Sequence, residues 1–413
     1  MVFYAGLDWG ESHHDMAVID RRGDLVSHVR VADDVNGLSE LLGVLRAVKR
    51  NRRAIPIGIE TGQGLMVAGL RKAGQPVVVL NPTQVANYRS RTAVQRKKSD
   101  RGDARLLAHV LRVDGDAHRP APTLSEQAVA VRDLTRAHRL TQRAGLLLAG
   151  RLRSVLRDYY PAAVTAWAHL PGGITRPEAR FVLSAASTPA RAARLTTGRL
   201  ETLLTAAGRT RLITAEAARL HALFHTRALR QPPTIEEAMG QHATALLAQL
   251  DAMLKSAQSL WTHVDILAER HPHTPIYRSF PGLGPVLAAR LLGELGDDPA
   301  RFPSARNLRA FCAATPITWA SGTSHKVSYR RKSNPILAET GHLWAFSALT
   351  CSPGARGLYD RRRAAGDRHP AALRRVYAHF LGGLHFCLRT GTSYDEGRAF
   401  PTTEPQSTAT VDA

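Results

Sequence analysis

The sequence predicts an α/β domain at the N-terminus followed by all-α regions. Three observations lead to this prediction. Short apolar runs alternate with amphipathic stretches over residues 2–81. Two much longer stretches, 124–160 and 235–270, carry apolar residues at helical spacing. Finally, 413 residues are too many for one ordinary core, so two or more domains are expected.

The N-terminal region has the order of elements of an RNase H-like sheet. Three strands come first and two strands separated by helices follow, with strands at 2–8, 15–20, 24–31, 54–60 and 76–81 and helices at 36–49 and 64–73. One acid ends the first strand and another ends the fourth, which is the layout of an RNase H-like sheet. The basic segment 89–98 then leads into a helix whose predicted N-cap is Ser99.

The middle of the chain is predicted to be a pair of long helices. Stripes of Ala and Leu on such helices favour helix packing or self-association, so we expect a coiled-coil region that forms a homo-oligomer, a dimer or a tetramer. Shorter Ala- and Arg-rich helices at 170–233 separate the long ones, and no chemistry is assigned to them.

The C-terminal region is predicted to be a small helical domain. Its PGLGP segment precedes an apolar helix and resembles a helix-hairpin-helix, in which Gly282 and Gly284 expose backbone N–H groups to a DNA phosphate. A packed Gly/Pro turn is the alternative explanation. A serine-containing loop at 314–335 follows, and the composition from 393 onward predicts disorder. The predicted domains are 1–121, 122–270, 271–392 and 393–413.

The charge balance predicts a nucleic-acid partner. Lys and Arg number 56 against 34 Asp and Glu, a net charge of +22, and such an excess gives salt-sensitive affinity for a polyanion. No apolar run of about 18 residues is present, so no membrane partner is expected. The acidic N-terminus does not resemble a signal peptide, so we expect a cytoplasmic, nucleoid-associated protein. Three widely spaced cysteines, Cys312, Cys351 and Cys387, predict neither disulfides nor a zinc site.

Four carboxylates stand where two strands end and a helix begins. Asp8 ends the first strand and Glu60 ends the fourth. Asp100 and Asp103 lie three residues apart at a helix start, so both can face the same way. Capping or the helix dipole is the commoner explanation for any one such acid. Together they predict a Mg²⁺ site, because carboxylates bind Mg²⁺ and two such ions commonly catalyse phosphoryl transfer on DNA.

Several motifs resemble one family. GLDWG, IETG, NPTQVANYRSR and KKSDRGDARLLA near the N-terminus are similar to the DEDD transposases of insertion-sequence family one hundred and ten. PGLGPVLAARLLGELGD, RFPSARNLRAF, SGTS and KSN resemble the C-terminal domain of the same family. The resemblance implies a RuvC-like N-terminal domain, a DNA recombinase activity, and a structured bridge RNA that pairs with donor and target DNA.

The resemblance also implies roles for single residues. Asp8, Glu60, Asp100 and Asp103 would form the metal-binding tetrad, and Ser321 would be the nucleophile. The chain departs from the family pattern at 9–11, 314–316 and 327–334, so Ser324 and Ser328 remain rival nucleophiles. The residues predicted to contact nucleic acid are Arg89, Arg91, Arg96, Lys97, Lys98, Gly282, Gly284, Lys326, Arg330, Arg331 and Lys332.

Two other functions fit parts of the same pattern. A junction-resolving nuclease would use the tetrad with water as the nucleophile and leave free ends. A non-catalytic nucleic-acid-binding protein would use the acids only as caps. Neighbouring His13 and His14 have no spaced partner for a zinc site and are interpreted as solvent-facing or core histidines.

Overall fold

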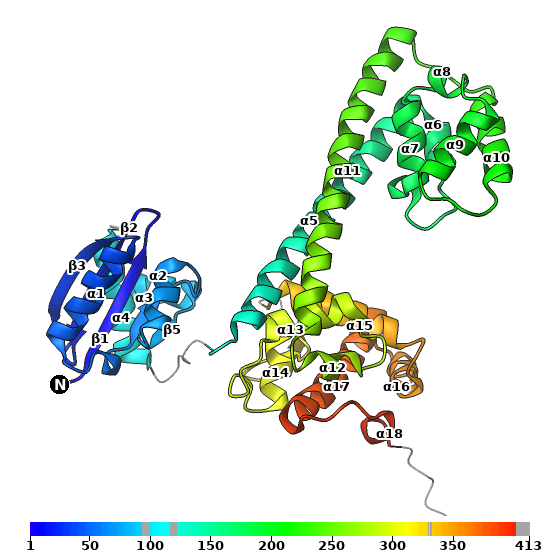
Figure 1. Ribbon diagram of the computed structural model, residues 1–413. Helices are drawn as coiled ribbons and strands as arrows, with labels where there is room; N and C mark the ends of the chain where they lie inside the picture. The colour runs from blue at the N-terminus through cyan, green and yellow to red at the C-terminus, as the bar shows by residue number, and fades with distance from the viewer. Residues whose placement is uncertain (93–98, 116–121, 329, 331–332, 402–413) are drawn as a thin grey trace, which may run out of the picture. The chain divides into compact units, whose positions relative to one another are not determined.

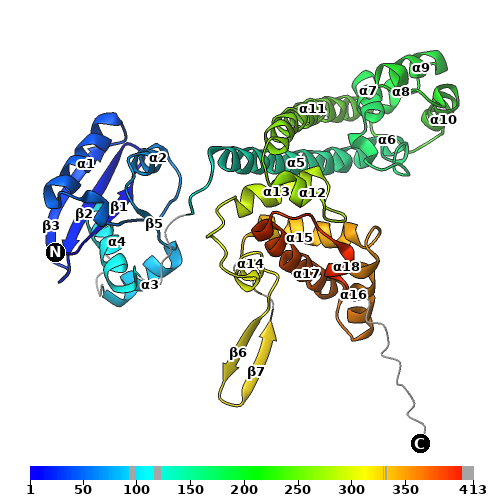
Figure 2. The same ribbon diagram turned by 60° about the horizontal axis from the view of Figure 1, so that its bottom comes forward.

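The computed structural model describes residues 1–92, 99–115, 122–328, 330 and 333–401. It divides into two compact units, Met1–Thr123 and Leu124–Ala413. The first unit is α/β and the second is helical apart from one hairpin (Figures 1 and 2). The predicted α/β start is therefore confirmed, and the remainder is helical as predicted except for this hairpin.

The first unit contains a five-stranded sheet with the order β3-β2-β1-β4-β5. β1, β2 and β3 form the predicted antiparallel meander, whereas β4 and β5 run parallel to β1. The strands are β1 Phe3–Trp9, β2 His13–Asp20, β3 Leu25–Ala32, β4 Ile57–Ile59 and β5 Val77–Val79. The helices are α1 Val35–Val48, η1 Arg52–Ala54, α2 Leu65–Lys72, α3 Pro82–Thr92 and α4 Asp100–Asp114.

Helix starts in this unit follow local capping chemistry. The Ser99 side chain accepts a hydrogen bond from the Gly102 amide and starts α4, as predicted. The start of α3 was not predicted. The Asn81 Oδ1 atom accepts from the Thr83 amide at 2.9 Å and Pro82 is the first helical residue, so the Asn-Pro pair was the signal for this helix.

Helices cover both faces of the sheet. Alternate residues of β1, such as Leu7, pack with α1 and α2 in one core. On the other face, Leu107 and Leu111 of α4 pack with Val78 and Leu80. The contact between α4 and β1 depends on Gly6, where a Cβ atom would lie 2.1 Å from the Ala104 carbonyl oxygen and 2.4 Å from the Ala108 amide nitrogen.

The second unit is built around two long helices. α5 Glu126–Tyr159 and α11 Pro233–Glu269 lie side by side, as predicted (Figure 1). At one end they share a core that includes Trp167 with the intervening helices α6 Pro161–Thr165, η3 Gly173–Thr175, α7 Pro177–Ala185, α8 Pro189–Ala192, α9 Thr197–Ala206 and α10 Ile213–His225.

A second core lies at the other end of the long pair. It surrounds Phe280 and Trp344 and is formed by α12 Thr274–Arg278, α13 Pro285–Leu295, α14 Ala305–Phe311, α15 Pro335–Ala348, α16 Pro353–Ala364, α17 His369–Thr390 and α18 Glu396–Ala399. The predicted disorder is wrong for 393–401, because Tyr394 and Phe400 pack against this core. The rest of that segment lies outside the described residues.

The predicted loop at 314–335 contains a β-hairpin. β6 Ile317–Ser321 pairs with β7 Ser324–Ser328, and Gly322 occupies the two-residue turn with a φ of 55° (Figure 2). The β-branched and aromatic residues on both sides of Gly322 were the signal for these strands. The prediction of a loop here was therefore incomplete.

The three cysteines of the chain all lie in the second unit. All are free thiols, with Cys312 and Cys387 buried and Cys351 exposed. Burial raises the pKa of the Cys312 thiol to about 12, which keeps it protonated and unreactive.

The close approach at Gly6 makes a stability prediction. Gly6→Ala should destabilise the first unit by about 3 kcal/mol or more, because the new methyl group meets backbone that cannot move aside cheaply. Gly43→Ala is the matched control, since nothing lies within 4 Å of its Cβ position in α1. It should stabilise by about 0.5–1 kcal/mol. Urea unfolding, monitored by hydrogen exchange of the β1 amides, measures the free energy of unfolding of both variants. Equal free energies would contradict the close packing at Gly6.

Candidate functional site

Asp8 and Glu60 lie at the ends of two neighbouring parallel strands. The register pairs Gly6 with Gly58 and Leu7 with Ile59, so Asp8 and Glu60 follow at corresponding positions. Asp8 lies two residues beyond Gly6, and therefore on the face that α4 covers. Asp8 is half-buried, whereas Glu60 is exposed.

The N-terminus of α4 brings Asp100 and Asp103 to the same face of the sheet. Asp103 directly precedes Ala104, the residue whose carbonyl approaches Gly6, and is only 7% exposed. Asp100 is the first helical residue, and its side chain is 54% exposed. The local sequence thus directs three acids, Asp8, Asp100 and Asp103, toward one contact between β1 and α4.

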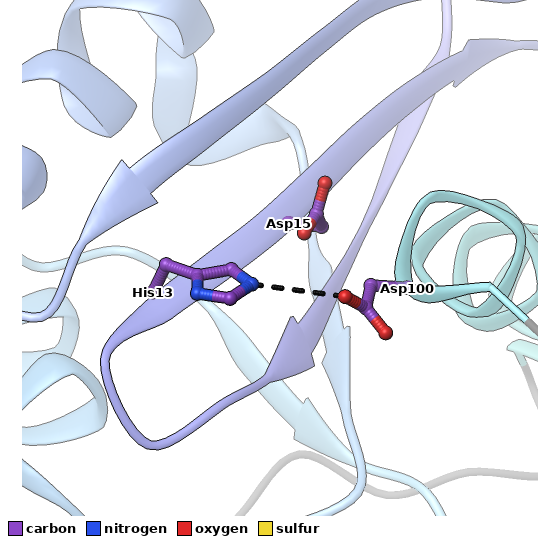
Figure 3. A group of neighbouring side chains, drawn as sticks. All are labelled: His13, Asp15 and Asp100. Atoms are coloured by element: carbon purple, nitrogen blue, oxygen red, sulfur yellow. Dashed lines mark ion pairs between the residues drawn. The ribbon is translucent and has the colours of Figure 1, made fainter.

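Asp15 is a fifth acid at this edge, and it was not among the residues predicted from the sequence. The β1–β2 register places it directly opposite Asp8, and it is 1% exposed. Ligand atoms of His13, Asp15 and Asp100 all lie within 4.8 Å of one another (Figure 3). The alternation of His13 and Asp15 on β2, opposite Asp8, was the available signal.

Arginines neutralise three of these acids. Arg30 Nε donates to Asp15 Oδ2 at 3.0 Å, and Arg30 Nη2 lies 2.9 Å from the same oxygen. The Nη2 atom also lies 3.1 Å from Asp100 Oδ2. The hydrogen bond to Asp15 raises the pKa of the Arg30 guanidinium. Arg89 donates to Asp103 at 2.8 Å. Without such cations, the crowded carboxylates would repel one another.

The donor set at this edge fits a divalent cation. Asp15 and Asp100 offer carboxylate oxygens, and His13 offers one imidazole nitrogen. The His13 Nε2 atom lies 3.7 Å from Asp100 Oδ2, and a dashed line marks this pair in Figure 3. His13 was predicted to be a solvent-facing or core histidine, whereas the structure groups its ring nitrogen with the oxygens of Asp15 and Asp100. A cation bound here would share Asp15 and Asp100 with Arg30, so binding and the ion pairs are coupled.

The predicted basic segment has mixed roles. Arg89 bonds Asp103 and thus supports the acidic edge, while Arg91 lies over the Tyr88 ring at 4.7 Å. Arg96, Lys97 and Lys98 lie outside the described residues. At the PGLGP turn, a Cβ on Gly282 would lie 2.5 Å from the Ala348 amide nitrogen, so close packing explains this glycine. Gly284 has open space at its Cβ position.

The β6–β7 hairpin carries all three candidate serines on one face. Its register pairs Ser321 with Ser324, Trp319 with Lys326 and Ile317 with Ser328. Cross-strand partners and alternate residues share a face, so the three pairs lie together, and His325 and Val327 lie on the other face. The Trp319 Nε1–H donates to Ser328 Oγ at 2.9 Å. Ser321 and Ser324 flank the turn and are exposed.

Asn334, which follows the hairpin in the sequence, is bonded to the helical core. Asn334 accepts hydrogen bonds from the amides of Ile336 and Leu337 and starts α15. Its Nδ2 donates to Glu294 at 2.6 Å, and Arg136 binds the same carboxylate at 2.6 and 2.9 Å. Of the nearby cations predicted to bind nucleic acid, Lys326 is exposed and Arg330 is half-buried, while Arg331 and Lys332 lie outside the described residues.

Two family models of transposases match this chain, one in its N-terminal part and one in its C-terminal part. A DEDD, IS110-type model described as transposase matches residues 5–161, and one described as transposase of the IS116/IS110/IS902 family matches 275–360. The chain is 46% identical to the mini-circle putative transposase for IS117 of Streptomyces coelicolor, over 97% of each. It is 27% identical to an insertion element IS900 42 kDa protein of Mycobacterium paratuberculosis, over 95% of this chain and 96% of that protein.

The matched regions include both groups of candidate residues. The four acids predicted from the sequence fall in the first region and the three serines in the second. Within the described part of the chain, no helix combines the length and apolar character needed to cross a membrane.

Proposed function

This chain belongs to the IS116/IS110/IS902 family of transposases, which act on DNA by phosphoryl transfer, and we propose that it cuts and rejoins the DNA of an insertion element through Ser321 and a Mg²⁺ site. The 46% identity over nearly the whole chain is the observation that carries this proposal.

The first unit serves as a RuvC-like, RNase H-like catalytic domain. The parallel addition of β4 and β5 to the β1–β3 meander supports this assignment. Asp8, Glu60, Asp100 and Asp103 would hold Mg²⁺, with Asp15 beside them. The bound ion would supply charge stabilisation at the reacting phosphate. When no metal ion neutralises the acids, Arg30 and Arg89 hold Asp100 and Asp103 in place.

Ser321 makes the covalent link to DNA. Its Oγ attacks a backbone phosphorus, the bond from phosphorus to one DNA oxygen breaks, and that oxygen leaves as a hydroxyl after taking up a proton. The serine proton passes to a base or to solvent. The number of phosphoester bonds is unchanged, so attack by another DNA hydroxyl on the phosphoserine rejoins the strand. Lys326 on the same face favours an approaching phosphate and the serine alkoxide.

Ser321 is preferred among the three serines for two reasons. It holds the position of the Ser-Gly step in the family resemblance, and it flanks the exposed turn. Ser328 already accepts a hydrogen bond from Trp319, which ties its hydroxyl to the indole. Ser324 lies opposite Ser321 and remains the rival.

The partners of the reaction are donor and target DNA, with a structured bridge RNA as guide. The net charge of +22 supports nucleic-acid binding, and the family resemblance supports the guide. Arg91, Gly284, Lys326 and Arg330 are the described residues available for such contacts. The long pair α5–α11 would assemble a dimer or tetramer of three-domain protomers in the cytoplasm, on the nucleoid.

The acids are expected to be essential for catalysis and dispensable for folding. Asp8→Asn, Glu60→Gln and Asp103→Asn should each lower recombination at least about 100-fold, because each removes ligand charge from the metal site. Thermal stability should hold in Asp8→Asn and Glu60→Gln, since losing one carboxylate relieves repulsion. Asp103→Asn should lower it modestly, because Arg89 loses the charge of its partner. A plasmid recombination assay and thermal melts test this. The control is Glu40→Gln, at an exposed position of α1. Normal recombination by two of the three variants would remove the acids from the mechanism.

Ser321 is expected to be essential for recombination without contributing to the affinity for DNA. Ser321→Ala should bind DNA normally but yield no recombinants, whereas Ser324→Ala and Ser328→Ala should remain active. The same plasmid assay and a binding isotherm for each variant measure this. Activity in Ser321→Ala together with inactivity in Ser324→Ala would move the nucleophile to Ser324.

A dedicated guide RNA should copurify with the protein. Protein expressed from the complete element with its flanking DNA should retain one structured RNA at a salt concentration that strips other RNA, because nonspecific phosphate contacts weaken steeply with salt. Sequencing the bound RNA after a salt series is the measurement. Recovery of unselected cellular RNA at every salt concentration would contradict the guide.

A further inference from the structure

The β6–β7 hairpin carries a tryptophan that the described residues of its unit leave mostly uncovered. Trp319 is 62% exposed, whereas Trp167 and Trp344 are 1% and 0% exposed in the two cores of the same unit. Every residue of β6 after Ile317 is exposed, and so is every residue of β7 before Ser328. A two-stranded hairpin with no layer against it is marginally stable in water. The exposed indole therefore indicates a surface that meets a partner.

The hydrogen bond to Ser328 fixes the orientation of this indole. Trp319 Nε1 donates to Ser328 Oγ at 2.9 Å, which uses the polar edge of the ring within the hairpin. Because the Nε1 edge is bonded within the hairpin, the flat face of the indole is the part that can contact a partner. A flat aromatic face is the usual platform for an unpaired nucleobase.

The position of Trp319 relative to Ser321 suits a DNA strand. Both lie on one face of β6, two residues apart, which is about 7 Å at the rise of a β-strand. Bases along a DNA strand are spaced by about 3.4 Å. A base stacked on Trp319 would thus lie within one or two nucleotides of a phosphate at Ser321, and Lys326, directly across from Trp319, would reach the backbone between them.

The charge around the hairpin favours nucleic acid over a protein partner. Residues 314–338, the segment that contains the hairpin, include Lys326, Arg330, Arg331 and Lys332 and not one Asp or Glu. A segment with basic and no acidic residues favours contact with the phosphates of a nucleic acid.

We propose that Trp319 stacks on a base of the DNA strand that Ser321 attacks and so positions the scissile phosphate at the turn of the hairpin. This role rests on the proposed Ser321 chemistry. The base must be unpaired or flipped out of the duplex to expose its face. Trp319 is thus a positioning residue, and the partner of the hairpin is single-stranded DNA.

The test separates base stacking from phosphate contact. The full-length protein is titrated with oligothymidylate and with an abasic strand of equal length and charge, and the ratio of the two affinities is the readout. The wild type should prefer the base-bearing strand about 5- to 100-fold. Trp319→Phe should keep most of this preference, and Trp319→Ala should lower the ratio toward one. Phe346→Ala, which removes a 57% exposed aromatic of α15, is the matched control and should keep the ratio.

Further measurements distinguish the possible failures. Oligothymidylate should quench tryptophan fluorescence in wild type and in Ser321→Ala, but much less in Trp319→Phe. A Ser321→Ala variant that recombines yet shows this quenching would overturn the serine chemistry while leaving the stacking intact. An unchanged affinity ratio in Trp319→Ala would overturn the stacking. An unchanged ratio accompanied by loss of oligomeric mass in sedimentation would instead assign Trp319 to an interface between protein copies.

Discussion

The close contact between α4 and β1 at Gly6 determines where the acids of the first unit lie. Because Gly6 has no side chain, the backbone of α4 at Ala104 and Ala108 approaches the strand directly. Asp103 precedes Ala104, and Asp8 lies two residues beyond Gly6 on the same face. A larger residue would separate the helix from the strand and with it the acids that they carry.

Gathering acids in this way creates an electrostatic cost that the chain offsets with arginine. Arg30 bonds both Asp15 and Asp100, and Arg89 bonds Asp103. Asp15 is almost fully buried, so a compensating charge and hydrogen bonds are required there rather than optional. The large basic excess of the chain therefore has two uses, one within the acidic edge and one toward nucleic acid.

Features that depend on a local sequence pattern could be predicted, whereas features that depend on the pairing of strands could not. Ser99 as the start of α4 and the two long helices followed from capping and helical spacing, and the structure has them. Asp15 was missed because its position beside Asp8 follows from the β1–β2 register, which no local pattern specifies. The hairpin at Trp319 was interpreted as a loop because its strands are short and exposed on both faces, so the β-branched and aromatic residues around Gly322 do not form the clear alternation of a half-buried strand.

Packing against distant residues accounts for the remaining differences. The segment 393–401 has a disorder-like composition, yet Tyr394 reaches Phe280 with ring centroids 4.5 Å apart. Gly282 lies in the turn predicted to bind phosphate, and its fit against Ala348 is not visible in the sequence. Such contacts link residues more than 60 positions apart, beyond any local signal.

The central claim is that this transposase joins DNA through a covalent serine intermediate, and the identity of the linked residue tests it most directly. The reaction is stopped with denaturant, the protein is digested, and the DNA-bound peptide is sequenced by mass spectrometry. The account predicts a nucleotide phosphate on the Ser321 hydroxyl. Free DNA ends with no linked peptide, under conditions in which the wild type recombines, would contradict it and indicate water as the nucleophile.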